Sequence, residues 1–517
     1  MGRIKALADD AFEGRGPGTE RGEMAADWIA AEMTRIGLEP GNNGSYFQNV
    51  PAVAIALYPE SSSFEIAGPK GVQRLKFAEE AAFWTPRFDK TEQRIADADL
   101  VFVGYGVNAP EYKWNDYAGI DVKGKVVVLL INDPGFATHD DSLFKGRAMT
   151  YYRRWTYKFE EAARQGAAGV IIVHDTVPAA YGWQVVRNSN TGRKLYLDGP
   201  NGNTDQVTMQ SWVTLDVAKS MFADAGMDFD AQMLAANKRG FRSVPMRGLK
   251  LNAVMHSSLD HLRTRNVIGV VRGRERPNDY VLYTAHWDHL GVKPDVPGPD
   301  KIHNGAIDNA SGVSAILEIG EAFAKAPRRP RRSVMIASVT LEEQGLLGSQ
   351  YLAAHPPVPL AHIVGGLNID GISPQGRSRD MTVTGSGASQ LEDILASVLK
   401  TQGRYAAPDP EPQKGGFYRS DHISLAKVGV PMLRASAGID LREGGKPAGM
   451  AVRDAYRTLH YHQPSDEFDP SWNMASPMEE LATLFEVGDR LANSSAWPNW
   501  YKSNEFRAIR DKSMRRH

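Results

Sequence analysis

After residue 262, short apolar runs alternate with segments of helical periodicity. In residues 389–400, Leu391, Ile394, Leu395 and Val398 follow the i, i+3, i+4, i+7 spacing of one buried helix face. The same criteria predict strands at 267–271, 280–285, 333–339, 362–369 and 430–433, and helices at 311–324, 345–354, 389–400 and 477–492. This alternation predicts an α/β fold: a mostly parallel mixed sheet with helices on both faces.

The pattern before residue 262 differs. A helix is expected at 23–37, and β-rich runs follow at 100–105, 125–131 and 169–173. The middle block has no cluster of His, Asp and Glu at metal spacing, so we expect it to be non-catalytic. The predicted divisions are residues 1–95, an inserted block 96–250, a catalytic domain 251–495 and a tail 496–517.

Two irregular stretches are expected to be loops. The turn-rich segment Glu13 to Thr19 is interpreted as a backbone turn. The segment Ser436 to Thr458 is expected to be a long loop that borders a substrate pocket, with Arg434, Tyr456 and Arg457 as candidates for substrate contact.

Composition narrows the classes of partner and chemistry. A net charge of −1 over 517 residues argues against nucleic acid as the main partner, and no run of 18 apolar residues predicts a membrane span. Because the chain has no cysteine, a transition-metal site must use His and carboxylate ligands. The first ten residues show no apolar leader, which fits either a cytoplasmic protein or a mature exported one.

Metal-binding residue types follow the predicted strands. His286 and Asp288 follow one strand, Glu342 and Glu343 another, Asp370 a third, and Asp308 opens a helix. Each acidic residue alone is more simply explained as a helix cap. Because the carboxyl ends of parallel strands meet at one edge of a sheet, their conjunction predicts a metal site there.

Six motifs in order resemble those of the co-catalytic zinc aminopeptidases. They are His286-Trp-Asp288, Asn304 to Gly312, Leu341 to Gly345, Asn368-Ile-Asp370, Ser420-Asp-His422 and Tyr461 to Asp466. This family includes relatives of bacterial leucyl aminopeptidase, glutamate carboxypeptidase II, the transferrin receptor and glutaminyl cyclase. The middle block is similar to the protease-associated domain inserted in some members.

The resemblance implies two zinc ions per chain, bridged by Asp308. His286 and Asp370 would complete one site, and Glu343 and His462 the other. Glu342 would be the general base for a water held between the metals, and Asp288 would orient His286. The resemblance also implies a cis peptide bond at Asp308-Asn309.

Nearby residues are not needed as ligands. We expect His289, His303 and His460 to be surface or loop histidines because the ligand set is already full. Asp421 and His422 match a family motif near the site, and a supporting role for them stays open.

The resemblance implies an exopeptidase that removes N-terminal residues from peptides with a free N-terminus. Carboxypeptidase action, a glutaminyl cyclase-type acyltransferase and a metal-free receptor-like protein are the alternatives, although the full ligand set and Glu342 favour the hydrolase. A periplasmic or secreted location is expected by analogy. The sequence predicts no oligomeric state.

Overall fold

The computed structural model describes residues 1–294 and 296–515. The chain divides into two compact units. The first comprises Met1–Val50, Arg263–Pro412 and Gly416–His517, and the second comprises Pro51–Leu262 with Gln413–Gly415. Two strands, β2 (Phe47–Leu57) and β13 (Val244–Val271), contribute residues to both units. Among the described helices, none is long and apolar enough to cross a membrane.

The first unit is built on a mixed sheet. Its strands are β1 (Glu39–Pro40), β14 (Arg276–His286), β17 (Arg332–Val339), β18 (Ile363–Asn368) and β21 (Met432–Leu433), together with the end of β13. Strands β21, β18, β14 and β17 are mutually parallel in that order, and β13 pairs with β17 in antiparallel register. Smaller strands are β15 (Gly291–Val292), β16 (Ile302–His303), β19 (Asp380–Val383), β20 (Tyr405–Pro408) and β22 (Ala435–Ala437).

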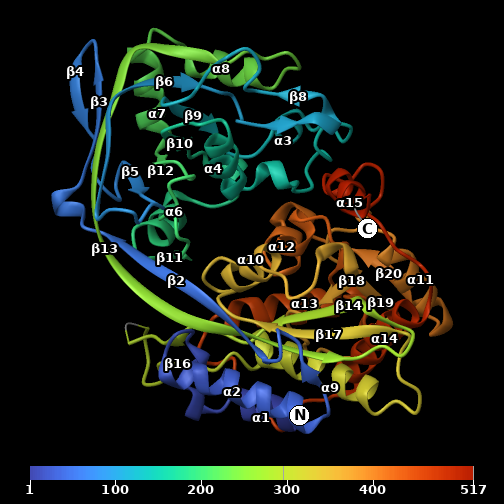
Figure 1. The fold of residues 1–517 in the computed structure, drawn as a ribbon. Coiled ribbons are helices and arrows are strands. Elements are labelled where there is room, and N and C mark those ends of the chain that lie inside the picture. The colour runs from blue at the N-terminus through green and yellow to red at the C-terminus, as the bar shows by residue number, and fades with distance from the viewer. Residues whose placement is uncertain (295, 516–517) are drawn as a thin grey trace. The chain divides into compact units, whose positions relative to one another are not determined.

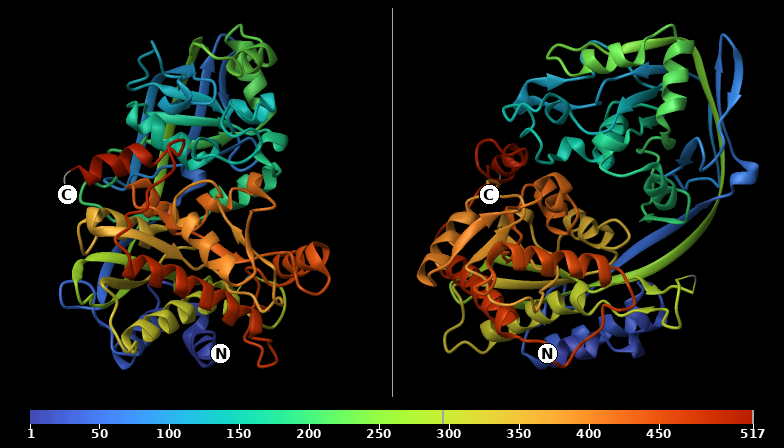
Figure 2. Two further views of the ribbon diagram at one scale, coloured as in Figure 1. Left: turned by 90° about the vertical axis from the view of Figure 1, so that its right-hand side faces the viewer. Right: turned by 180° about the vertical axis from the view of Figure 1, so that it is seen from behind.

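Helices cover both faces of this sheet (Figure 1). They are α1 (Gly2–Leu7), α2 (Glu20–Arg35), α9 (Gly312–Ala324), α10 (Leu347–Ala354), α11 (Leu391–Thr401), α12 (His422–Lys427), α13 (Gly445–Leu459), α14 (Ala475–Asn493) and α15 (Arg507–Met514). Successive side chains of β14 point to opposite faces of the sheet, so they pack in two different hydrophobic cores. Val281 and Tyr283 pack with α2, α9, α11 and α14, and Leu282 packs with residues of α10 and α12. Figure 2 shows this layered arrangement from two further sides. The predicted α/β fold is thereby confirmed.

The second unit has its own sheet. Its strands are β3 (Ser63–Gly68), β4 (Gly71–Arg74), β5 (Ala81–Trp84), β6 (Glu92–Phe102), β9 (Val126–Leu130), β10 (Gly169–Val173) and β12 (Met209–Val213), with the short β7 (Asn108–Ala109), β8 (Trp114–Asn115) and β11 (Lys194–Leu197). Strands β6, β9, β10 and β12 run parallel, and β5 closes one edge antiparallel to β12. The helices are α3 (Pro134–Thr138), α4 (Trp155–Arg164), α5 (Thr176–Ala179), α6 (Trp183–Asn190), α7 (Leu215–Asp224) and α8 (Phe229–Ala236).

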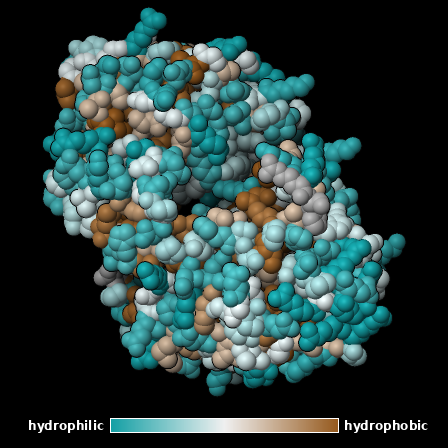
Figure 3. Space-filling view, in the orientation of Figure 1, coloured by the Kyte–Doolittle hydropathy of each residue, from teal (hydrophilic) through white to brown (hydrophobic). Residues whose placement is uncertain are grey.

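This unit extends beyond the expected 96–250 block on both sides, because β3, β4 and β5 pair within it. Its description as a protease-associated domain stays a prediction. The face shown in Figure 3 is mainly hydrophilic on both units, with apolar side chains confined to separate patches.

One expected loop is a helix. The stretch Ser436 to Thr458 contains α13, so its prediction as a loop is wrong. Gly449 is the only buried residue of that helix, whose other residues are partly or fully exposed.

Candidate metal centre

The predicted ligands meet at the carboxyl edge of the parallel strands in the first unit. His286 is the last residue of β14, Glu342 and Glu343 lie in the turn after β17, and Asp370 follows β18. Asp308 lies in the turn Ala306–Ser311 that leads into α9. His462 comes from the segment after α13.

Asp308 faces two histidines with its two oxygens. Its Oδ1 lies 3.2 Å from His286 Nε2, and its Oδ2 lies 3.2 Å from His462 Nε2. His286 Nε2 is also 3.4 Å from Asp370 Oδ1, and His462 Nε2 is 3.1 Å from Glu343 Oε2. Asp308 therefore lies between two histidines, each of which also faces a second carboxylate.

These separations fit a metal. Tetrahedral zinc with bonds of about 2.0–2.2 Å places its ligand atoms about 3.3–3.5 Å apart. His462 Nε2 is buried and makes no hydrogen bond despite its two carboxylate neighbours, which leaves its ring nitrogen available as a ligand. A donor set of imidazole and carboxylate is the one that zinc accepts in a protein without cysteine.

The buried carboxylates perturb one another and the histidines. Burial lowers the pKa of His462, but Asp308 and Glu343 outweigh it and raise that pKa to about 10. Burial opposes ionisation of Asp370, yet Arg434 and His286 lower its pKa to about 2. Arg434 Nη2 lies 3.1 Å from Asp370 Oδ2. The site thus brings Asp308, Glu343 and Asp370 close to two histidines, and a divalent cation could balance the negative charge of these carboxylates.

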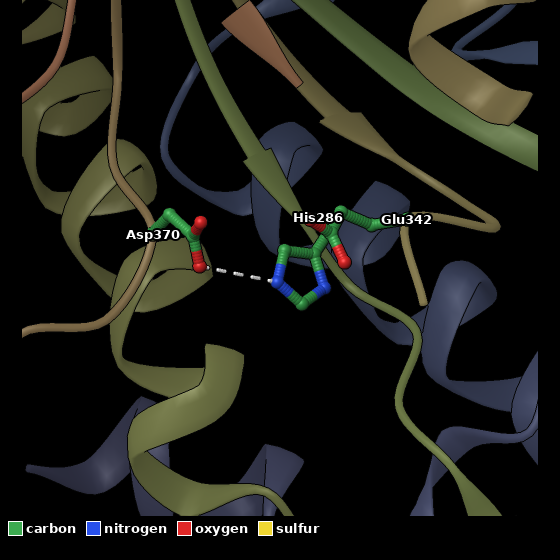
Figure 4. Close-up of side chains that lie close together, drawn as sticks. All are labelled: His286, Glu342 and Asp370. Carbon is green, nitrogen blue, oxygen red and sulfur yellow. Dashed lines mark ion pairs between the residues drawn. The ribbon is translucent and has the colours of Figure 1, made fainter. Parts of the chain in front are cut away.

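Glu342 lies beside His286 without occupying either ligand set. Figure 4 shows Glu342, His286 and Asp370 converging from three segments, and their potential ligand atoms lie within 4.8 Å of one another. Burial raises the pKa of the Glu342 carboxyl well above its usual value, and the neighbouring Asp370, Asp421 and Glu343 charges act in the same direction. A carboxyl with a raised pKa is suited to take up a proton.

Asp288 acts differently from the expectation. The Nδ1 of His286 is 3.0 Å from the backbone carbonyl of Asp288 and 3.8 Å from its carboxylate, so the carbonyl is the nearer acceptor. The Asp288 carboxylate instead accepts the backbone N–H groups of Glu342 and Glu343, at 3.1 and 3.4 Å. It therefore orients the turn that carries Glu342 and Glu343.

Asp466 supports the shared ligand in the same way. Its two oxygens accept the backbone N–H groups of Ile307 and Asp308 at 3.1 and 3.0 Å, and Tyr456 donates its hydroxyl to it at 3.2 Å. The Asp308-Asn309 peptide bond is cis, as the resemblance implied. Tyr456 thus has a partner within the protein, and its contact with a substrate stays a prediction.

Two of the three histidines expected on the surface or in loops are buried. His289 lies in the loop after β14 and His303 in β16, so neither is a surface histidine. His289 Nδ1 lies 2.8 Å from Glu343 Oε1, and His289 groups with Asp308 and Glu343 as possible metal ligands. The spacing His286-x-x-His289 after a strand was the signal that could have identified it. His460 is partly buried, and its Nδ1 lies 3.0 Å from the Ser465 carbonyl oxygen.

Asp421 and His422 are fully buried beside the site. The charge of Asp421 contributes to the raised pKa of Glu342 and Asp288, so these two motif residues lie in the surroundings of the site and not among the ligands described above.

Comparisons with known proteins agree with this geometry. Residues 266–485 match the model of peptidase family M28. A glutamate carboxypeptidase 2 homolog of Caenorhabditis briggsae is 24% identical over 389 residues, which are 64% of this chain and 46% of that protein. A probable zinc metalloprotease of Leptosphaeria maculans is 38% identical over 114 residues, 21% of this chain and 24% of that protein.

Among solved structures, an aminopeptidase from Aneurinibacillus sp. strain AM-1 is similar with a TM-score of 0.48 and 18% identity, covering 96% of this chain and 94% of that one. The chain spans less than half the length of the two curated relatives named above. The matched segment holds all five predicted ligands and Glu342. Residues 266–485 thus match peptidase family M28, and the relative from Leptosphaeria maculans that matches this chain is named a probable zinc metalloprotease.

Proposed function

We propose that this chain is a di-zinc aminopeptidase. The observation that carries the proposal is Asp308, whose two oxygens each face a different histidine at 3.2 Å and so define two adjoining ligand sets. His286, Asp308 and Asp370 would hold one zinc ion, and Asp308, Glu343 and His462 the other. Bound zinc would supply Lewis-acid activation of the attacking water and of the substrate carbonyl.

The chain's own groups supply the proton transfers. Glu342 accepts a proton from the attacking water and delivers it to the nitrogen of the leaving amine, so the scissile C–N bond breaks with no charge left on the product amine. The Asp288 carboxylate holds Glu342 in place through its backbone N–H. Asp466 fixes the backbone of Asp308 and is itself oriented by Tyr456.

The charges around the site favour an N-terminal amine over a C-terminal carboxylate. Arg434 is paired with Asp370, and Arg457 forms an ion pair with Glu411. Arg453 lies 3.5 Å from Asp409 and 3.4 Å from Glu411. Because these arginines already have carboxylate partners, a substrate carboxylate would have to displace one, whereas the acidic groups of the site attract an ammonium group. Carboxypeptidase action is the second candidate because the glutamate carboxypeptidase homologues match this chain.

A substrate panel tests the proposal. The zinc-loaded protein is assayed on aminoacyl-p-nitroanilides, N-acetylated peptides and N-terminal glutaminyl peptides. We expect hydrolysis of the anilides, no cleavage of the N-acetylated peptides, no cyclised product, and two zinc ions per chain by elemental analysis. The matched variant Glu342→Gln should retain its zinc and lose roughly 10²–10⁴-fold in kcat. Cleavage of N-acetylated peptides alone, or less than one zinc per chain, would refute the proposal.

A further inference from the structure

The side chain of Arg15 is buried beneath the candidate metal centre. Arg15 is 1% exposed and ends the short helical turn Asp10–Arg15 near the start of the chain. Its Nε donates to the Trp287 carbonyl at 2.7 Å, and its Nη2 donates to the Gly305 carbonyl at 2.9 Å. Its Nη1 donates to the carbonyls of Leu7 and Asn304, at 2.7 and 2.6 Å.

These carbonyls flank metal ligands. Trp287 lies between His286 and Asp288, and Gly305 lies three residues before Asp308. One planar guanidinium therefore joins the segment that carries a ligand of one set to the segment that carries the shared ligand. The backbone of the same turn takes part, because the His289 N–H donates to the Arg15 carbonyl at 3.3 Å.

The turn Asp10–Arg15 ends in three consecutive residues whose backbone lies in the left-handed region of φ/ψ space, and this conformation brings its backbone close to the metal centre. Glu13, Gly14 and Arg15 have φ angles of 47°, 65° and 51°. A Cβ at Gly14 would lie 2.4 Å from the His303 carbonyl oxygen and 3.0 Å from that of Gly291. A glycine is thus required where the turn meets the β15–β16 hairpin, and Arg15 follows it directly.

The positive charge of Arg15 also acts on the carboxylates near it. Arg15 donates its four hydrogen bonds to neutral carbonyls. Among the residues that the structure describes, no single carboxylate therefore neutralises its positive charge in an ion pair. Burial lowers the pKa of Arg15 to about 10, while Asp466, Asp308, Asp288 and Glu343 act to raise it, so the group is protonated at neutral pH. That charge lies among the carboxylates Asp466, Asp308, Asp288 and Glu343 and attracts them.

We propose that Arg15 is a positioning residue of the metal centre, which fixes the spacing between the His286 and Asp308 segments. This inference rests on the zinc binding of the proposed function. Lysine cannot replace it fully, because a single ammonium group cannot span carbonyls that arginine reaches with three separate nitrogens.

The test measures zinc affinity by competition with a chromogenic chelator, and the Tm of the metal-free protein by circular dichroism. The variants are Arg15→Met and Arg15→Lys. The matched control is Arg3→Met, which removes another buried N-terminal arginine whose partners are Glu32, Glu318 and Glu321, away from the metal ligands.

We expect zinc affinity to fall about tenfold or more in Arg15→Met, as for other groups that orient metal ligands, and by less in Arg15→Lys. Arg3→Met should lower Tm and leave zinc affinity within twofold of wild type. If Arg15→Met does not fold, Arg15→Lys decides alone.

An affinity loss below threefold in the folded Arg15 variant, or an equal loss in Arg3→Met, overturns the inference. Wild-type protein that binds no zinc would instead refute the proposed function, so the two failures are distinguishable.

Discussion

At the residue scale, His289 determines how Glu343 presents itself to a metal. Its Nδ1 lies 2.8 Å from Glu343 Oε1, while Glu343 Oε2 faces His462 at 3.1 Å. Because one oxygen is held by His289, the other is left as a single ligand atom. His289 Nε2 has no hydrogen-bond partner in the protein, and the ring lies 5.6 Å from that of His462 between centroids.

Removal of this contact should weaken one of the two metal sites. We expect His289→Ala to lower zinc affinity at the Glu343 and His462 site by about 10–100-fold, because the orientation of a ligand carboxylate is lost. His289→Asn, which can place an amide near the position of Nδ1, should recover part of that loss. Zinc remaining after dialysis against a graded chelator measures the effect, and His460→Ala is the control. Equal retention of both zinc ions in His289→Ala would contradict this role.

Four of the five predicted ligands follow a predicted strand or open a predicted helix, as His286 and Asp370 do, whereas His462 was assigned only by the resemblance. The contacts around these residues have no such signal. Asp288 was expected to orient His286, and its carboxylate accepts two backbone N–H groups instead. Arg15 reaches segments some 270 residues away in sequence, and no local pattern encodes such a contact.

At the element scale, strands β14, β17 and β18 and helices α2, α9, α10, α11 and α14 were predicted to within about four residues because their buried faces show the expected periods. Helices α1, α12, α13 and α15 and strands β19, β20 and β22 were not predicted. Helix α14 was predicted from its apolar face, but one buried position on it is occupied by a polar residue. Glu480 is 2% exposed, and it accepts the Ala437 N–H at 3.0 Å, which joins α14 to β22.

Glu480 should make stability depend on pH. Burial raises its pKa from 4.5 to about 7, so the folded protein binds an additional proton between these values. The cost of ionising Glu480 is absent below pH 4.5, grows as pH rises and is complete above pH 7, where it is about 3 kcal/mol.

The substitution Glu480→Gln keeps a side-chain oxygen that can accept the Ala437 N–H. It also removes the free-energy cost of ionising a buried carboxyl. The variant should match wild type near pH 4.5 and exceed its free energy of unfolding at pH 8 by up to about 3 kcal/mol. Urea unfolding of the zinc-loaded proteins measures the difference. Glu486→Gln, at a more exposed position of α14, is the control and should show no such trend. A constant difference between Glu480→Gln and wild type at all pH values would contradict the assignment.

At the scale of the whole molecule, the two units have separate hydrophobic cores. The cores of the second unit draw their buried residues from 53–255, and those of the first from 4–38 and 267–492. The sequence indicated two kinds of domain through the change of pattern near residue 262. It misplaced the start of the second, because β3 to β5 are short and their pairing with distant strands has no local signature.

Separate cores predict that residues 51–262 fold alone. The fragment contains the parallel strands β6, β9, β10 and β12 and the helices between them, so its buried apolar surface does not depend on residues 263–517. We expect a cooperative thermal transition by circular dichroism. No zinc should bind, because both groups of possible metal ligands in the described part of the chain lie between His286 and Asp370.

Phe102→Ala, at a fully buried position, should destabilise the fragment by about 3–5 kcal/mol. A fragment that melts without cooperativity, or that is unaffected by Phe102→Ala, would show that its core requires the rest of the chain.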